Sequence, residues 1–298
     1  MVRIAVVVVH HGDPGPTERL LARLAGWACL GALVVVDHGP EPLPQALPSP
    51  TRVIGDGRRN PGFAAGVNAG VCATGDEPYL LLLNPDVEVE EGAVLACAAA
   101  LDADDAMALV TPTLVVPDGR VWYAGGRVDR WRGVAVHDDF GARVDTIASG
   151  APQAVGFVPL TCALVRRAAL EEVGGVPEGW FLYWEDVDLA ARLQARGRSL
   201  GWARSVQAVH RRGQAGDPLR NLSPTMLELD TRNRLWWVRR EPSRLRRVSA
   251  LAWTGPLAAR RAWLIARSGG GAARWWALAR GLRAGFGPVA EGLRATSR

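Results

Sequence analysis

Lysine is missing from this chain of 298 residues, so its 35 basic residues are all arginine. Cysteine is scarce as well, because only four are present and no two of them form a Cys-x-x-Cys pair. Scattered cysteines of this kind give no indication of a zinc site or a disulfide framework, and they fit a reducing compartment such as the cytoplasm. The four are Cys29, Cys72, Cys97 and Cys162.

Long apolar runs are also absent. No stretch approaches about 18 consecutive apolar residues, so the sequence predicts no membrane-spanning helix. The first residues, MVRIAVVVVHHGDPG, contain one arginine and a short apolar run without the small-residue cleavage site of a signal peptide. They predict a first strand instead. No internal repeat is present.

Acidic residues are scarce at one end only. Residues 211–298 contain 18 arginines and five acids, a net charge of +13, whereas residues 1–210 contain 17 arginines and 25 acids, a net charge of −8. The same C-terminal part holds six of the twelve tryptophans. The sequence therefore divides into a mildly acidic body and a basic, tryptophan-rich arm.

The body alternates strand patterns with helix patterns. The predicted strands are 3–9, 32–37, 51–55 and 79–83, and the predicted helices are 17–30, the stretch from Phe63 and 91–102. A proline-rich segment, 38–50, cannot hold a long helix. This alternation predicts an α/β fold built on a mostly parallel, doubly wound sheet.

The strand of four leucines ends in Asn84-Pro85-Asp86. Pro85 cannot donate a ladder hydrogen bond, so the strand must end there. Asp86 then lies just past the carboxyl end of a central strand, where open α/β sheets hold their ligands. An ordinary turn explains the same three residues, because Asn, Pro and Asp all favour turns for local reasons.

A second acidic segment, EDVDLAARL, predicts a helix that begins near Glu185. On that helix Asp186 shares a face with Leu189, which places a carboxylate toward the core, where it is costly unless partnered or functional. Glu185 and Asp188 lie on a neighbouring face, and Asp188 forms a favourable i,i+4 pair with Arg192. The alternative is an acidic first turn that complements the helix dipole, and this reading describes Asp188 best.

In this order and spacing the motifs resemble family 2 inverting glycosyltransferases of the GT-A fold, in particular the bacterial rhamnosyltransferase-like branch. The resemblance covers roughly residues 1–215 and rests on RRNPGFAAGVNAG, LLLNPDV, FLYWEDVDLAARL and AVHRRG. It implies a Rossmann-like, mostly parallel sheet flanked by helices. It also implies a nucleotide-sugar-binding half at 1–110 and an acceptor-binding and catalytic half at 111–215. The charge and tryptophan pattern adds a basic helical extension at 216–298.

The resemblance assigns roles to the two acidic motifs. Asn84-Pro85-Asp86 occupies the place of the family's Asp-x-Asp metal motif, so Asp86 is expected to hold Mg²⁺ or Mn²⁺ at the donor diphosphate, with Asn84 orienting a water or a ribose hydroxyl. The acid of the Glu-Asp pair is the family's general base, and it maps onto Asp186 with Glu185 as second choice. The implied reaction moves a sugar, rhamnose by branch resemblance, from a nucleotide-diphosphate sugar to an acceptor hydroxyl with inversion, in cell-envelope polysaccharide or glycolipid synthesis.

Further positions match the family less specifically. Asp37 matches a contact to the nucleobase or ribose, and a strand-end turn explains it equally well. Asn60, Gly62 and Asn68 fall in the segment that passes beside the nucleotide, although helix packing also accounts for small residues there. His210 matches a histidine that binds the metal or the diphosphate, against the alternative of a surface histidine at a strand end.

The sequence departs from the family at His10-His11-Gly12-Asp13 and at the proline-rich segment, and both changes affect the nucleobase pocket. A non-catalytic, degenerate member that only binds nucleotide sugars therefore stays open as an alternative, as does glycosylation of a soluble natural product. A sugar-1-phosphate nucleotidyltransferase would need a glycine-rich loop after the first strand and usually a lysine on the phosphates. This chain has HHGDPGP at that place and no lysine, which argues against this class. A nucleic-acid partner is not expected, because the basic arm contains no recognised binding module.

The arm predicts short helices at 224–240, 243–254, 257–267 and 272–284, separated by proline and glycine. Basic helices with tryptophan suit the headgroup region of a membrane. For residues 243–298 we therefore expect peripheral association with an anionic surface at the inner face of the cell membrane, within reach of a polyprenyl-linked acceptor. The alternative is an ordinary extension packed on the body, as 224–240 is expected to be.

Overall fold

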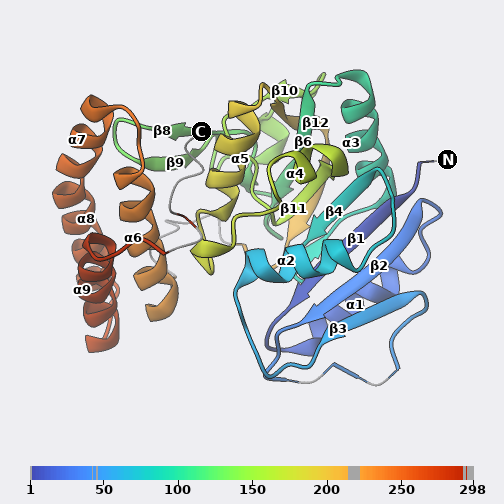
Figure 1. Cartoon of the computed structure of the whole chain (residues 1–298), viewed down its shortest axis with the longest axis horizontal. Coiled ribbons are helices and arrows are strands. Elements are labelled where there is room, and N and C mark those ends of the chain that lie inside the picture. The colour runs from blue at the N-terminus through green and yellow to red at the C-terminus, as the bar shows by residue number, and fades with distance from the viewer. Residues whose placement is uncertain (1, 42, 45, 214–221, 291–292, 294–298) are drawn as a thin grey trace.

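A mixed sheet flanked by helices forms the body of the molecule (Figure 1). This computed structural model describes residues 2–41, 43–44, 46–213, 222–290 and 293. The strands are β1 Ile4–His10, β2 Leu30–Asp37, β3 Thr51–Gly55, β4 Tyr79–Leu83, β5 Val87–Glu88, β6 Met107–Val115, β7 Val121–Tyr123, β8 Gly126–Asp129, β9 Val134–His137, β10 Gln153–Ala154, β11 Cys162–Arg166 and β12 Ser199–His210. The helices are α1 Pro14–Leu24, α2 Phe63–Cys72, α3 Glu91–Ala103, α4 Arg167–Glu172, α5 Glu185–Ala195, α6 Pro224–Arg239, α7 Arg244–Ala252, α8 Thr254–Arg267 and α9 Ala272–Phe286.

The sheet is parallel in its N-terminal half. Its main path runs β10-β12-β6-β11-β4-β1-β2-β3, and β1 pairs in parallel with both β2 and β4. All five residues of β4 are buried, as expected for a strand covered on both faces. Antiparallel β11 then joins β4 to β6, and β12 runs parallel to β6. The predicted α/β class with a mostly parallel sheet is confirmed.

The first helix lies earlier than predicted. It spans Pro14–Leu24 rather than 17–30, because Asp13 caps it by accepting a hydrogen bond from the amide of Gly15 at 3.0 Å. Proline is well suited to the first turn of a helix, where its missing N–H costs nothing. The residues assigned to the end of that predicted helix lead into β2, which begins at Leu30.

The four C-terminal helices form a lobe beside the sheet (Figure 1). Helix α9 packs closely along α6, because Gly281 has no side chain where a Cβ would lie 2.7 Å from the carbonyl oxygen of Glu228. Trp236 of α6 donates its indole N–H to the carbonyl of Ala284 at 3.1 Å. Part of the arm beyond 243 is therefore packed on α6, as the alternative of a packed extension describes. None of the helices in the described part of the chain is long and apolar enough to cross a bilayer.

Candidate functional site

The carboxyl ends of the parallel strands meet at one edge of the sheet. The register pairs His10 of β1 with Asp37 of β2, and Val8 of β1 with Leu83 of β4. A cavity of about 220 Å³ opens at this edge. Four of the predicted site residues line it: Asn60, Gly62, Asn84 and Asp86.

Asp86 and His210 form a pair at this edge. Short strand β5 begins directly after Asp86 and pairs with the end of β12, with Val87 opposite His210. This pairing brings the imidazole Nε2 to 3.2 Å from a carboxylate oxygen of Asp86. Burial alone would raise the pKa of Asp86, but the hydrogen bond and charge of His210, helped by the backbone and Arg212, hold that pKa below its usual value. Asp86 is therefore an ionised carboxylate beside an imidazole.

The loop before α2 makes a second wall of the cavity. Asn60 accepts a hydrogen bond from the amide of Gly62 at 2.9 Å, which closes a tight turn. Gly62 has φ +106°, and a Cβ there would lie 2.5 Å from the carbonyl oxygen of Phe181. Phe63, the first residue of α2, donates its amide to the same carbonyl at 2.7 Å. The loop is therefore joined to the segment that precedes α5.

Three histidines and an arginine line or border the same cavity, and the sequence patterns did not single them out as ligand contacts. His10, His11, His38 and Arg212 are among its lining residues. His11 faces the carbonyls of His38 and Gly39 at 3.1 and 2.8 Å, so its Nδ1 donates. Burial and the neighbouring His11 lower the pKa of His38 and favour its neutral form. The unusual His-His pair after β1 was the available signal.

Two predicted nucleotide contacts lie outside this lining. Asp37 accepts a hydrogen bond from the amide of Gly39 at 2.8 Å, as the turn alternative describes. Asn68 bonds Val176 in both directions, at 2.8 and 2.9 Å, and also donates to Glu178 at 2.8 Å. Their polar atoms hold loops together, so we leave both residues out of the donor site proposed below.

Glu185 and Asp186 begin α5 directly after an unusual turn. Phe181, Tyr183 and Trp184 all have positive φ, at 66°, 70° and 75°, although none of them is glycine. Phe181 and Leu182 line the cavity that also contains Asp86. The turn therefore joins the acidic start of α5 to the edge of the sheet where the Asp86–His210 pair lies.

The two adjacent carboxyl groups share a low-polarity environment. Burial raises the pKa of Glu185, and the neighbouring Asp186 raises it further. Burial also raises the pKa of Asp186, although hydrogen bonds from backbone amides, including that of Val187 at 2.8 Å, oppose the shift. Glu185 is the more buried of the two, and its Oε2 has no hydrogen-bond partner in the described part of the chain. Raised pKa values of this kind are typical of acids and bases in active sites.

Asp188 lies in the acidic first turn of α5, as predicted. It is also buried, and its carboxylate accepts the indole N–H of Trp180 at 3.0 Å. Arg192 lies 3.2 Å from the same oxygen, as the i,i+4 pattern predicted, and Arg240 from the end of α6 lies 3.3 Å from it. Asp188 is thus a buried anchor between α5, the preceding turn and α6.

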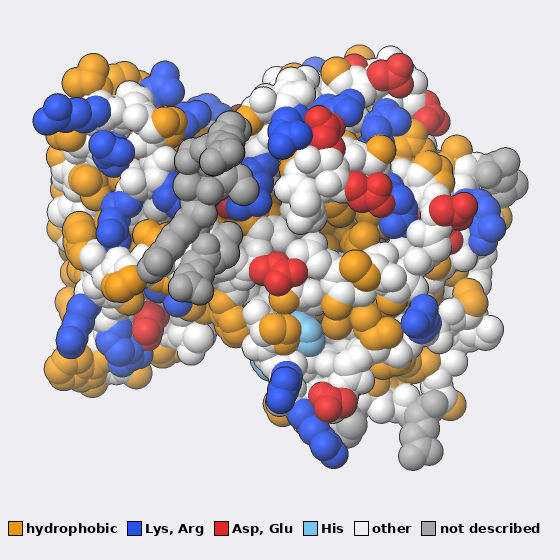
Figure 2. Space-filling model, viewed as in Figure 1, with side chains coloured by type: hydrophobic (Ala, Val, Ile, Leu, Met, Phe, Trp, Pro, Cys, Tyr) orange, Lys and Arg blue, Asp and Glu red, His pale blue; other side chains and the backbone are white. Residues whose placement is uncertain are grey.

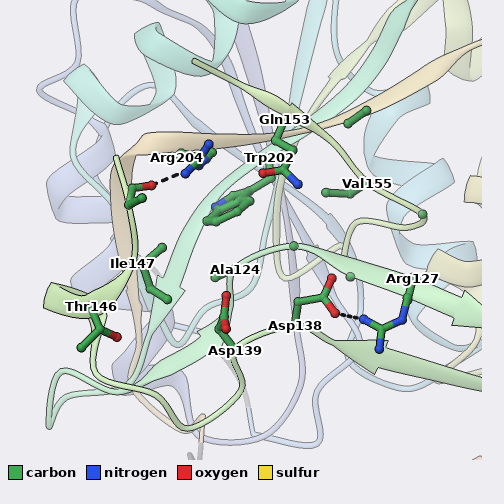
Figure 3. Close-up of a pocket in the computed structure, with 15 residues that line it drawn as sticks. Ala124, Arg127, Asp138, Asp139, Thr146, Ile147, Gln153, Val155, Trp202 and Arg204 are labelled. Atoms are coloured by element: carbon green, nitrogen blue, oxygen red, sulfur yellow. Dashed lines mark hydrogen bonds and ion pairs between the residues drawn. The ribbon is translucent and has the colours of Figure 1, made fainter. Parts of the chain in front are cut away.

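A larger cavity of about 530 Å³ lies elsewhere, between the β8–β9 hairpin and β12 (Figure 3). None of the predicted site residues lines it. Its polar groups are largely used within the protein: Arg127 pairs with Asp138, and Arg204 donates to the carbonyl of Ala148 at 3.0 Å. The indole N–H of Trp202 is bonded to Thr113 at 2.9 Å. We therefore place the chemistry at the smaller cavity.

Known proteins resemble this chain in sequence. It is 27% identical over 270 residues to N-acetylglucosaminyl-diphospho-decaprenol L-rhamnosyltransferase of Mycobacterium tuberculosis, a match that covers 80% of this chain and 87% of that protein. It is 22% identical over 246 residues to the low-salt glycan biosynthesis hexosyltransferase Agl10 of Haloferax volcanii, covering 78% and 74% of the two chains.

Solved structures resemble it in fold. GalNAc-T7 with UDP, GalNAc and Mn²⁺ matches with a TM-score of 0.58 and 15% identity, over 79% of this chain and 48% of that one, so this chain spans about half its length. The mannosyltransferase PcManGT of Pyrobaculum calidifontis, in complex with GDP-Man and Mn²⁺, matches with a TM-score of 0.51 and 15% identity, over 93% and 75%. At these identities the likeness concerns the fold, which is GT-A.

The family assignment follows from the sequence itself. The model of glycosyl transferase family group 2 matches residues 79–270, which contain the leucine strand, the acidic start of α5 and most of the helical lobe. The chain therefore belongs to glycosyl transferase family group 2 and is a glycosyltransferase.

Proposed function

We propose that this glycosyltransferase moves a sugar from a nucleotide-diphosphate sugar to an acceptor hydroxyl with inversion at C1. One observation carries the proposal: a single cavity is lined by Asp86, by the Asn60–Gly62 loop and by the turn that precedes Glu185 and Asp186. A group that binds a diphosphate and a group that accepts a proton are both needed for such a transfer. Asp86 lines the cavity, and the candidate proton acceptors Glu185 and Asp186 follow directly after the turn that lines it.

Asp86 and His210 fit a divalent cation at the donor diphosphate. The pair supplies one ionised carboxylate and one imidazole, a set suited to Mg²⁺ or Mn²⁺. The described residues contain no cluster of three or more metal-ligating side chains, so the diphosphate and water would complete the coordination. When bound, the ion supplies charge that stabilises the leaving diphosphate. Asn84 and Arg212 are placed to contact the donor from the same cavity.

Asp186 is the proposed general base, with Glu185 as its buried neighbour. Inversion requires attack on C1 from the face opposite the diphosphate, so a base on that side must remove the proton of the acceptor hydroxyl. The raised pKa of Asp186 makes it a stronger proton acceptor than an ordinary aspartate. Glu185 is more buried, and its Oε2 has no hydrogen-bond partner among the described residues, so it is protonated over a wider pH range and keeps the local charge low.

The sugar and the acceptor are inferred from relatives. The mycobacterial relative is named as an L-rhamnosyltransferase that acts on N-acetylglucosaminyl-diphospho-decaprenol. We infer rhamnose as the transferred sugar and a polyprenyl-linked glycan of the cell envelope as the acceptor. Glycosylation of a soluble natural product, or donor binding without transfer, are the competing outcomes of the test below.

An anionic membrane surface is the proposed partner of the helical lobe. Residues 244–286 contain nine arginines and no aspartate or glutamate. Large apolar side chains are exposed among them, including Leu245 (74%), Val248 (59%) and Trp263 (55%). Figure 2 shows orange and blue side chains interspersed over this lobe, at the left of the view.

Tryptophans of this lobe and of the adjoining hairpin are covered by arginines. The guanidinium of Arg267 lies 4.7 Å from the ring centroid of Trp263, and that of Arg132 lies 4.8 Å from that of Trp253. An indole beside a guanidinium suits the headgroup region, where the ring lies at the interface and the charge meets anionic lipid. This arrangement supports peripheral binding at the cytoplasmic face of the membrane.

The transfer itself is tested with the full-length protein. UDP-, TDP- and GDP-sugars are incubated with Mg²⁺ or Mn²⁺, with and without a short polyprenyl-diphospho-N-acetylglucosamine, and release of the nucleoside diphosphate is measured. Acceptor-dependent release from TDP-rhamnose supports the proposal. Metal-dependent binding without turnover of any donor would favour a non-catalytic member, and turnover only with a water-soluble acceptor would move the acceptor away from the membrane.

A further inference from the structure

The turn that presents the proposed base has a conformation that its residues do not favour. Phe181, Tyr183 and Trp184 occupy the left-handed region, which bulky side chains rarely adopt. Such a conformation persists only where the surrounding structure enforces it, and it is often found at functional sites. The question is which groups hold this turn.

Asn233 of α6 makes hydrogen bonds to most of this turn. Its side-chain nitrogen lies 3.1, 2.8 and 2.9 Å from the carbonyl oxygens of Trp180, Leu182 and Tyr183. Asn233 is fully buried, so its amide needs hydrogen-bond partners within the protein, and these carbonyls supply them. Two hydrogens shared among three acceptors fix the curvature of the turn.

Arg232 fixes the orientation of this amide. It donates from Nε to Oδ1 of Asn233 at 2.8 Å, so the oxygen faces the guanidinium and the nitrogen faces the turn. A second nitrogen of Arg232 reaches the carbonyl of Trp180 at 3.2 Å. The Arg232–Asn233 pair is therefore set to donate toward the turn, and a reversed amide would place two acceptors against each other.

The opposite side of the turn is held by the donor loop. Phe63 donates to the carbonyl of Phe181, and Gly62 leaves room for that carbonyl to approach. The turn is thus fixed between the loop that lines the donor cavity and a helix of the C-terminal lobe. Glu185 and Asp186 follow it with no intervening residue, so any change in its path moves them directly.

We propose that Asn233 is a positioning residue: by holding the left-handed turn at 181–184, it sets where Glu185 and Asp186 lie relative to the donor cavity. The inference rests on the proposed function, in which Asp186 is the base. It also assigns helix α6, which lies outside the sheet, a direct part in the geometry of the active site.

The test replaces Asn233 by alanine in the full-length protein. We expect kcat to fall on the order of tenfold to a hundredfold with donor KM nearly unchanged, because small misplacements of a reacting group have effects of that size. We also expect the acid limb of the kcat–pH profile to move toward lower pH, as a relaxed turn lets water reach the carboxyl groups. Hydrogen–deuterium exchange should rise at residues 181–187, a readout that needs no substrate.

Leu235→Ala is the matched control. Leu235 is buried in the same helix but packs against α9 at Gly285, away from the turn. At a similar loss of thermal stability it should leave kcat, the pH profile and exchange at 181–187 near wild type. If both variants lose kcat equally, or if Asn233→Ala does not raise exchange at 181–187, the positioning role is refuted.

Arg232→Met gives a milder variant in case Asn233→Ala does not fold. It leaves the amide in place but removes the hydrogen bond that orients it, so it should produce a smaller change in the same direction. Unchanged kinetics and unchanged exchange in Arg232→Met would overturn the proposal. A wild-type protein that turns over no donor would refute the proposed function, while the exchange result would still report on the turn.

Discussion

Asp86 is the side chain on which donor binding is expected to depend. It lies at the tip of β4, outside the buried core, so Asp86→Ala should leave the fold intact. We expect the variant to lose the metal-dependent part of its affinity for the nucleoside diphosphate, because Asp86 is the carboxylate that pairs with His210 in the described part of the chain. Thermal shift with nucleoside diphosphate and Mn²⁺ measures this, since a ligand raises the unfolding temperature only while it binds. An unchanged Mn²⁺-dependent shift would remove Asp86 from the proposed metal site.

Asp186 carries the prediction on catalysis. Asp186→Asn keeps the shape of the side chain but cannot accept a proton, so turnover should fall by roughly 10²–10⁴-fold. Donor affinity should barely change, because Asp186 lies outside the lining of the proposed donor cavity. If Glu185→Gln were the inactive variant and Asp186→Asn remained active, the roles of the two carboxyl groups would be exchanged.

Glu185 gives a prediction on stability and pH. Its pKa is raised in the folded protein, so the neutral form is favoured by folding, and this contribution is present at low pH and lost as the pH rises through the raised value. Glu185→Gln stays neutral at every pH. The variant should therefore gain stability relative to wild type as the pH rises, by about 1 kcal/mol or more near pH ~8. Unfolding curves measured between pH ~5 and ~9 check this, and parallel curves would contradict it.

At the scale of elements, the loop before α2 and the turn before α5 act as one unit. Gly62→Ala adds a Cβ that would meet the backbone of Phe181 at 2.5 Å, at a residue with φ +106°. We expect the loop to move away from the turn, raising donor KM and lowering stability by about 1–3 kcal/mol. Steady-state kinetics and thermal unfolding measure the two effects.

Gly174→Ala is a suitable control for this element. Gly174 also has positive φ, +77°, but nothing lies within 4 Å of the position of its Cβ. It should share the backbone strain without the contact to Phe181, and donor KM should not change. Equal effects of the two variants on KM would show that the contact between loop and turn is unimportant.

At the scale of the whole molecule, the helical lobe is expected to bind anionic vesicles. Leu245→Ser combined with Trp263→Ser removes two exposed apolar side chains without disturbing the core, so co-flotation with phosphatidylglycerol-containing liposomes should weaken. Binding of the wild type should also fall with salt, because screening reduces the attraction of arginines to lipid. Leu95→Ser and Val53→Ser, exposed on the body, serve as the matched control. If the wild-type protein never co-floats with the vesicles, the lobe does not bind membranes and its role is only structural.

A truncation of the helical lobe would be a poor test of vesicle binding. A truncation after residue 242 would remove α9 and expose the face of α6 that packs on it. It would also remove Ala250, whose carbonyl lies 2.8 Å from Arg234, a buried residue of α6. Loss of vesicle binding in such a truncation would not separate lipid contact from a damaged fold. Point substitutions on the outer face avoid this.

The sequence patterns predicted the α/β body, and the edge of its sheet where polar residues gather, for a simple physical reason. Buried parallel strands are recognisable as apolar runs, and polar residues that follow them must meet at one edge of the sheet. Asn84 and Asp86 were placed at this edge in this way. Contacts that depend on the path of a loop were not predictable, as Asn68 illustrates, because its amide bonds residues more than a hundred positions away.

The same reasoning explains what was not foreseen around α5. The helical period placed Asp188 in the acidic first turn, but its contacts to Trp180 and to Arg240, just past the end of α6, come from outside α5. No local pattern marks Phe181, Tyr183 and Trp184 as left-handed, because that conformation is imposed by Asn233 from outside the segment. Tertiary contacts decided both cases.

The dependence of the turn on Asn233 has a consequence for recombining members of this family. A designer who treats the sheet as one interchangeable module and the helices as another would place the crossover in the segment between β12 and α6. Such a hybrid would pair the turn of one parent with the amide of another, and register errors between them would appear as slow turnover in a well-folded protein. A crossover placed between α6 and α7, near residue 241, keeps the turn and Asn233 from the same parent. Only helices α7, α8 and α9 are then exchanged.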